Sequence, residues 1–203
     1  GASALLAGNS HEALYFPRLN LRQTADNSPA KSFPPSPAVA GIIARTDETR
    51  GVWKAPAGLD AALQGVGSLD VGLTDQDQAM LNPEAVNCLR AFPAHGLVVW
   101  GARTRAGLAS VASEWKYVNV RRMALFLERS ISAGLSWTVF EPNGERLWLI
   151  VRDSIERFLH SNFRQGAFAG QKPEHAYFVR CDSTTMTQDD LDNGRLICHI
   201  GFA

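Results

Sequence analysis

Few side chains in this sequence have the types and the spacing that catalysis requires. Cys88 and His95 are a thiol and an imidazole seven residues apart, and such groups can act as a nucleophile and its general base. The sequence shows no third group that would orient the imidazole, and a cysteine in an expected strand is usually a buried apolar side chain. We therefore expect no enzyme, with an intracellular thiol hydrolase as the alternative from a different class.

Metal-ligand residue types occur towards the C-terminus. The residues of these types are His175, Cys181, Cys198 and His199. Cys198 and His199 are neighbours in an expected strand, so their side chains point to opposite faces and cannot bind the same metal ion. The sequence therefore favours core cysteines and edge histidines over a metal site.

An acidic run near the C-terminus, Asp189 to Asp192, invites comparison with a calcium loop. Leu191 occupies what would be a ligand position, and no glutamate follows at the distance that a bidentate ligand requires. Capping of a short helix by Thr187 and Asp190 explains the run better.

Phosphate-binding glycine patterns are absent from the sequence. No G-x-x-x-x-G-K-[ST] spacing occurs, and the Gly65-Val66-Gly67 run lacks the third glycine of a dinucleotide turn. We expect no catalytic residue, no bound metal and no cofactor.

An aromatic and basic cluster precedes one strongly patterned helix. Its members, which could stack on bases and contact phosphates, are Trp115, Lys116, Tyr117, Arg121 and Arg122. The chain has 20 Lys and Arg against 20 Asp and Glu, so its net charge is zero and no overall field attracts a polyanion. We expect no nucleic acid partner, and interpret the cluster as a helix face that packs on neighbouring segments or subunits.

The remaining composition describes an ordinary folded chain of 203 residues with only three cysteines, which favours synthesis in a reducing compartment. No run of about 18 apolar residues occurs, and the N-terminal residues lack the basic start of a signal peptide. We expect a soluble protein without direct membrane insertion.

The N-terminal part reads as a lead-in segment. A short strand, Ala13 to Phe16, precedes an expected surface loop at 20–37, which is rich in Asn, Ser and Pro. A helix capped by Ser36 then runs to about Arg50. The expected organisation is a lead-in of residues 1–37 and a main domain of residues 38–203.

Two long amphipathic helices dominate the rest. One is expected from a cap at Asn119 to Gly134, and the other over 143–165. Strands are expected at 87–92, at 97–100 as a central strand, and at 177–181 and 196–200. The fold class is α/β (α+β), a mixed β-sheet packed against two long helices.

Several long motifs, in order and spacing, resemble one known family. They are GVWKAPAG (51–58), LNPEAVNCLRAFPAHGLVVWGARTR (81–105), WKYVNVRRMALFLERSI (115–131), FEPN (140–143) and YFVRCDSTTMT (177–187). Together they resemble the C-terminal conserved region of contractile tail sheath proteins, which occur in phages, phage-tail-like bacteriocins and contractile injection systems. The resemblance extends over roughly residues 13–203.

The resemblance implies a structural role without a cofactor. Copies of the chain would stack as hexameric rings around an inner tube, with this domain towards the tube, between baseplate and terminator proteins. The sheath would shorten to drive the tube through a cell envelope. Assembly would take place in the bacterial cytoplasm, and the product would be a virion tail or a tail-like particle. A type VI secretion-like sheath is the second structural reading.

In this family, arms of neighbouring subunits add strands to the sheet of the conserved domain. The resemblance therefore implies sheet edges that accept strands. The family continues beyond the equivalent of Ala203 with a final strand, which we expect to be missing here together with the N-terminal arm.

Charged side chains on the outer faces of the two long helices are the candidate contacts between subunits or with the tube. Exposed ion pairs are individually weak and can be remade during a rearrangement. The alternative for all of these side chains, Arg121 and Arg122 included, is pairing within the chain. The candidates are Arg121, Arg122, Arg129, Asp153, Glu156 and Arg157.

Overall fold

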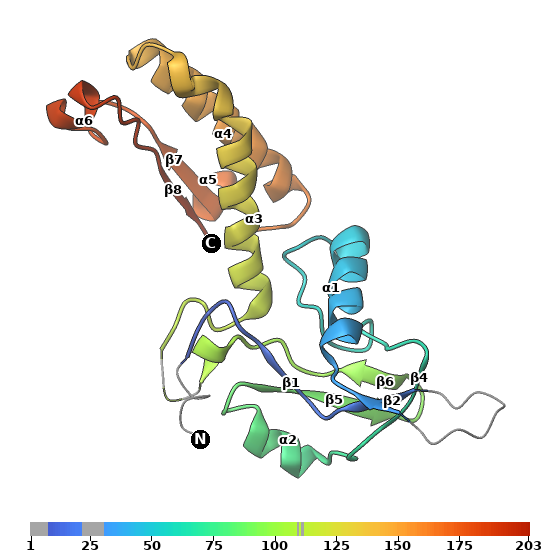
Figure 1. Cartoon of the computed structure of the whole chain (residues 1–203). Helices are drawn as coiled ribbons and strands as arrows, with labels where there is room; N and C mark the ends of the chain where they lie inside the picture. The colour runs from blue at the N-terminus through green and yellow to red at the C-terminus, as the bar shows by residue number, and fades with distance from the viewer. Residues whose placement is uncertain (1–7, 22–30, 109, 111) are drawn as a thin grey trace. The chain divides into compact units, whose positions relative to one another are not determined.

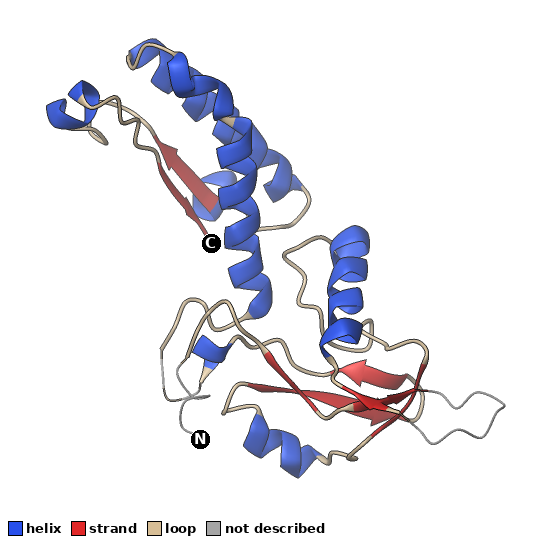
Figure 2. Ribbon diagram, in the orientation of Figure 1, coloured by secondary structure: helices blue, strands red, loops and turns tan. Residues whose placement is uncertain are grey.

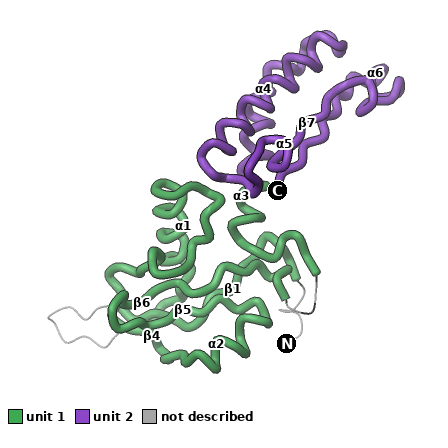
Figure 3. The backbone as a smooth tube through the Cα atoms, turned by 180° about the vertical axis from the view of Figure 1, so that it is seen from behind, with its two compact units in different colours: residues 1–124 green, residues 125–203 purple. Residues whose placement is uncertain are grey.

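The computed structural model describes residues 8–21, 31–108, 110 and 112–203 (Figure 1). The chain divides into two compact units, Gly1–Ala124 and Leu125–Ala203, and the division falls inside helix α3, Val118–Gly134 (Figure 3). The expected mixed class is confirmed, since helices and small sheets alternate along the chain (Figure 2). The expectation of one sheet is wrong, because the described strands form three.

The first sheet of unit 1 has the order β1-β5-β6, with β1 at Leu14–Phe16, β5 at Val86–Phe92 and β6 at Gly96–Val99. Strand β1 lies parallel to β5, and β6 lies antiparallel to it. The prediction that β6 is a central strand is wrong. Its outer side is nevertheless covered by the loop that contains Ala61. The amide of Val99 donates a hydrogen bond to the carbonyl of Ala61, and an amide of this loop donates a second hydrogen bond to the carbonyl of Leu97.

The second sheet of unit 1 has the order β3-β2-β4, with β2 at Leu19–Leu21, β3 at Ser32–Phe33 and β4 at Val66–Leu69. All of its pairings are antiparallel. The prediction of a loop at 20–37 is therefore wrong at both ends, because the chain forms strand β2 at one end and strand β3 at the other. Its middle part, 22–30, lies outside the described residues. The division at residue 37 stays a prediction.

Helix α1, Ser36–Arg50, packs on these sheets through Val39 and Ile42. The predicted cap at Ser36 is wrong, because Pro35 holds the cap position and no side chain caps the helix. The helix ends at Arg50, before Gly51, as expected. Gly51 has a φ of 91°, and a Cβ there would lie 2.4 Å from the ring of Trp53, so only glycine fits.

The core of unit 1 forms where α1 meets the sheets, from the side chains of Leu19, Val39, Ile42, Ala61, Leu89 and Val99. Two short helical segments complete the unit, α2 at Asp75–Leu81 and the 3-10 turn η2 at Arg105–Gly107. The spacing of Thr74 and Asp77 predicts a capping box, and the structure confirms it: the backbone amide of Asp77 donates to the hydroxyl of Thr74, and the carboxylate of Asp77 accepts from the backbone amide of Thr74.

Unit 2 contains the end of α3, a 3-10 turn η3 at Ser136–Phe140, and helix α4 at Glu145–Arg164. Helix α4 follows the predicted pattern, since Trp148, Val151, Ile155 and Leu159 are buried on one face. The rest of the unit comprises α5 (Pro173–Ala176), β7 (Tyr177–Arg180), α6 (Gln188–Asp192) and β8 (His199–Phe202). Strands β7 and β8 pair antiparallel, and β8 begins later than predicted.

Candidate assembly surfaces

Arg122, a member of the predicted charged set, forms an ion pair inside unit 1. Its guanidinium donates two parallel hydrogen bonds to the carboxylate of Asp47, at 2.7 and 2.6 Å. These bonds raise the pKa of Arg122 above its ordinary value, and the two side chains are only 29% and 27% exposed. A bidentate, half-buried pair of this kind fixes the start of α3 against α1.

Arg121 is also engaged within the unit. Its guanidinium lies over the ring of Trp115, 4.8 Å from the centroid, and contacts the imidazole of His11. The predicted cap at Asn119 is wrong, because α3 has already begun at Val118 and the amide of Asn119 donates to the carbonyl of Trp53. Trp115, Arg121 and Arg122 of the aromatic and basic cluster are thus in internal contacts, while Tyr117 is 46% exposed.

Unit 2 places its charges differently. Arg157 and Asp153, one helical turn apart as an i to i+4 ion pair requires, form such a pair on the outer face of α4, at 2.9 Å, with 72% and 62% of their side chains exposed. Glu156 lies 3.9 Å from Arg152 on the same helix. Arg129 on α3 is exposed and makes no hydrogen bond or ion pair with the described residues. These four predicted residues are at the surface, three of them in ion pairs within α4, and their contacts with other subunits stay a prediction.

Large apolar side chains are exposed where α3 gives way to α4. Phe140 is 97% exposed and Val139 is 71% exposed, both in η3. Trp137 precedes them, and Leu149 and Ile150 are exposed in the first turns of α4. Exposed apolar side chains that follow one another closely in the sequence, as these do, are a candidate interaction surface. We name these five residues the η3 patch.

The β7-β8 hairpin is a sheet of only two strands in the described part of the chain. One of its faces is covered, since Tyr177 and Phe202 pack with Phe168, and Tyr177 contacts His160 of α4. The other face exposes Phe178, 56% accessible, above Gly201, where a Cβ would lie 2.2 Å from the phenyl ring.

Each strand of a two-stranded sheet directs half of its backbone groups outward, away from its partner. A hollow of about 270 Å³ lies beside the hairpin, lined by residues 174–178 and 201–203. The hairpin therefore offers unpaired edges and a space next to them.

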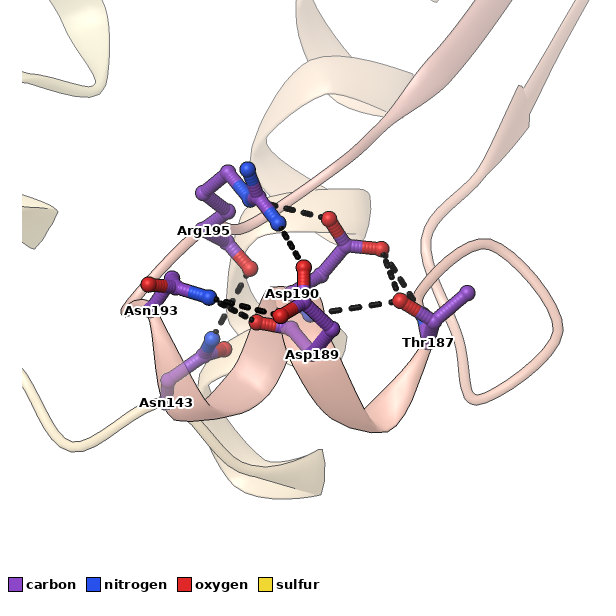
Figure 4. Close-up of polar contacts among 6 residues, drawn as sticks. All are labelled: Asn143, Thr187, Asp189, Asp190, Asn193 and Arg195. Carbon is purple, nitrogen blue, oxygen red and sulfur yellow. Dashed lines mark hydrogen bonds and ion pairs between the residues drawn. The ribbon is translucent and has the colours of Figure 1, made fainter.

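The acidic run forms a closed network around α6 (Figure 4). Thr187 and Asp190 make the predicted capping box, and Arg195 pairs with both Asp189 and Asp190. Hydrogen bonds from Thr187 lower the pKa of Asp190. Asn143 donates to the backbone carbonyl of Arg195, which ties α6 to the start of α4. The prediction of capping is confirmed.

The residues considered for catalysis are not brought together. Cys88 is buried in β5, and burial raises the pKa of its thiol. His95 lies in the turn after Phe92, and four residues of strand separate that point from Cys88 by about 13 Å. The thiol of Cys88 and the imidazole of His95 are therefore not in contact as a nucleophile and its base.

Among the described ranges, no group of three or more His, Cys, Asp or Glu side chains is arranged to hold a metal ion. No helix in the described part of the chain has the length and apolarity needed to cross a membrane.

Several important residues escaped prediction. Asn87 is fully buried in β5, and its amide clamps the backbone of Arg103 through bonds of 2.6 and 2.7 Å. Arg105 is buried and donates to the carbonyl of Glu84. The signal that was available for the η3 patch is the presence of Trp137, Val139 and Phe140, three large apolar side chains within four residues, just after the predicted end of the helix at Gly134.

Known families match almost the whole chain. Residues 19–105 match the phage tail sheath protein central domain, and residues 110–203 match the phage tail sheath C-terminal domain. The tail sheath protein of Enterobacteria phage T4 is 27% identical over 160 residues, covering 78% of this chain and 23% of that protein.

Two solved structures are similar over the full fold. A chain in the contracted PVC sheath complex of an extracellular contractile injection system is 38% identical, with a TM-score of 0.87, covering 100% of this chain and 55% of that one. A chain in the contracted helical sheath of the anti-feeding prophage is 41% identical, with a TM-score of 0.84, covering 97% and 53%. This chain therefore spans about a quarter of the curated relatives and about half of these sheath chains.

Proposed function

The chain belongs to the contractile tail sheath family, and on that premise we propose that it is a structural subunit of a sheath that contracts around an inner tube. Copies stack as hexameric rings, and contraction drives the tube through a cell envelope. The partners are further copies of the chain, the tube protein, and baseplate and terminator proteins at the two ends.

The single observation that best supports this proposal is the β7-β8 hairpin. A two-stranded sheet is marginal by itself, and it gains when further strands pair with its edges. The hairpin has its covered face buttressed by Tyr177 and Phe168 while its edges stay open. Strands from neighbouring copies would complete this sheet and join one ring to the next by strand addition.

Side chains for remaking contacts during contraction are supplied by unit 2. Arg129, Asp153, Glu156 and Arg157 are exposed, and an exposed pair contributes only about 0.2–1 kcal/mol, so exchanging partners costs little. Arg121 and Arg122 were proposed for the same role, and their internal partners make them supports for α3 in our account.

No bound cofactor is needed, because the work comes from exchanging one packing of many copies for another. A gain of about 1 kcal/mol per subunit, the size of a surface interaction, becomes large when hundreds of subunits move together. We propose assembly in the bacterial cytoplasm and a final location in a virion tail or tail-like particle.

Electron microscopy of the intact gene product, produced together with its tube protein, tests the proposal. Wild-type protein is expected to form sheaths around tubes. A variant with Phe140→Ser and Phe178→Ser is expected to fold but to leave tubes bare, while Met80→Ser, at a 60% exposed residue of unit 1, is the matched control. A wild-type product that stays a monomer beside its tube protein would refute the proposal.

A further inference from the structure

Cys181 and Cys198 face one another at the end of the β7-β8 ladder. The ladder pairs Tyr177 with Phe202 and continues to Arg180 with His199, so the next pair in the same register is Cys181 with Cys198. Beyond them, the hydroxyl of Thr185 donates to the carbonyl of Ile197 at 2.9 Å. The two cysteines are therefore held opposite each other from both sides.

This placement suits a covalent bond. Residues opposite each other in an antiparallel pair have Cβ atoms about 4.5–5.5 Å apart, close to the spacing of a disulfide, and both side chains continue the face of the hairpin that carries Tyr177 and Phe202. Each thiol also shifts the pKa of the other: the neighbouring Cys198 lowers that of Cys181, and Cys181 raises that of Cys198. Cys88, the third cysteine, is in β5 of the other unit and has no such partner.

We propose that Cys181 and Cys198 form an intrachain disulfide when the protein meets a disulfide oxidant such as oxidised glutathione. The thiolate of Cys198 attacks the oxidant, which releases one glutathione thiolate and leaves a mixed disulfide. The thiolate of Cys181 then attacks the Cys198 sulfur and displaces the second glutathione. Two electrons pass to the oxidant, and the two protons end on the two glutathione thiols.

Accessibility decides the order of these two steps. Cys198 is partly exposed and Cys181 is buried, so the oxidant reaches Cys198 first. Burial raises the pKa of both thiols, and Asp182 further raises that of Cys181 while Arg152 lowers it. The fraction of thiolate near neutral pH is small, so the first step is slow and the bond forms on prolonged exposure.

The disulfide closes the loop of residues 182–197, which contains α6 and its network of Thr187, Asp190 and Arg195 (Figure 4). A crosslink at the base of a loop restricts its openings. The disulfide would join the two strands of the hairpin covalently at the base of the loop that carries α6, in a particle that has left the reducing cytoplasm. The bond depends on the geometry of the hairpin alone, and not on whether the chain builds a sheath.

Peptide mapping of the folded chain tests the proposal. The protein is held in oxidised glutathione, free thiols are blocked with iodoacetamide under denaturing conditions, and the product is cut with trypsin. Cleavage after Arg180 and Arg195 places Cys181 and Cys198 in separate peptides, 181–195 and 196–203. We expect these two peptides to be joined, a loss of about 2 Da from the intact chain, and a fully alkylated Cys88.

Matched variants check the assignment. Cys88→Ser is expected to form the same linked peptides, and Cys181→Ser is expected to stop at a glutathione adduct on Cys198. Slower amide exchange of α6 in the oxidised wild-type chain is the independent readout. Glutathione adducts that never close in the wild-type chain, or disulfides between chains in place of the linked pair, would overturn the proposal.

Discussion

Two arginines show how comparable side chains lie in different surroundings in the two units: Arg122 is paired inside unit 1, and Arg157 is exposed on unit 2. In unit 1, Arg122 donates a bidentate pair of hydrogen bonds to Asp47. The buried side-chain amide of Asn87 forms two hydrogen bonds with the backbone of Arg103. In unit 2, Arg157 and Asp153 lie exposed on one helix, and Phe140 is almost wholly in solvent.

The difference is between polar groups paired inside the fold and groups left at the surface. In unit 1, two-point contacts such as those of Arg122 and Asn87 join segments that are distant in sequence. In unit 2, the edges of the hairpin and the side chains of the η3 patch are exposed, and we propose above that neighbouring copies cover them. A sheath subunit needs both properties, because its copies must keep their shape while their contacts change.

The largest expected effect distinguishes a core residue of unit 1 from the η3 patch. Leu89→Ala removes a fully buried side chain and should lower the free energy of unfolding by about 2–5 kcal/mol. Phe140→Ala should change it by less than about 0.5 kcal/mol, because the ring is exposed. Urea titrations of both variants measure this, and equal losses would erase the contrast between the units.

The next effect compares the two arginines. Arg122→Ala leaves the half-buried carboxylate of Asp47 without its partner and should destabilise the chain by about 1.5–3 kcal/mol. Arg157→Ala removes an exposed helix pair worth about 0.3–0.5 kcal/mol. Double-mutant cycles with Asp47→Ala and Asp153→Ala isolate each pair. A coupling for Arg157 as large as that for Arg122 would contradict our assignment.

The two capping boxes provide a smaller comparison, since each unit has one. Thr74→Ala and Thr187→Ala each remove a hydroxyl. In the folded chain this hydroxyl accepts a hydrogen bond from the backbone amide at the third helical position. Each should cost about 1 kcal/mol. Because Arg195 also holds Asp190, we expect the loss at Thr187 to be the smaller one. Thermal unfolding of both variants checks the order.

Acid should weaken both boxes to a still smaller extent. Hydrogen bonds from Thr74 and Thr187 lower the pKa of Asp77 and of Asp190 in the folded chain. Their contribution is therefore present above the unfolded pKa of about 4 and is lost as the pH falls through the lower folded value. Unfolding titrations between neutral pH and pH 3 should show a shallower decline in the two threonine variants. If the free energy of unfolding declined with pH equally in the wild-type chain and in the two threonine variants, the two capping carboxylates would not contribute to the pH dependence of stability.

Features of this fold that depend on local patterns were predictable from the sequence. The apolar stripe of α4, the Asp153 and Arg157 pair and both Thr-to-Asp boxes follow from spacings within one or two helical turns. The single expected sheet and the loop at 20–37 failed, because β2 finds its partner β4 more than 40 residues away. No local signal specifies such a pairing.

The same limit applies to the candidate contacts. Sequence spacing placed Arg121 and Arg122 on an outer helix face, and only the fold brings Asp47, Trp115 and His11 against them. Exposure of Phe140 likewise depends on where α3 ends. The family motifs predicted the role because a whole chain of residues matched, whereas the residues in contact require the tertiary arrangement.

Amide hydrogen exchange of β7 and β8, compared between the isolated chain and the assembled particle, tests the central claim most directly. We expect exchange along Tyr177–Arg180 and His199–Phe202 to slow at least about tenfold on assembly, the effect of about 1.4 kcal/mol, as added strands cover the edges. Unchanged exchange in both strands, with slowing confined to unit 1, would contradict the account.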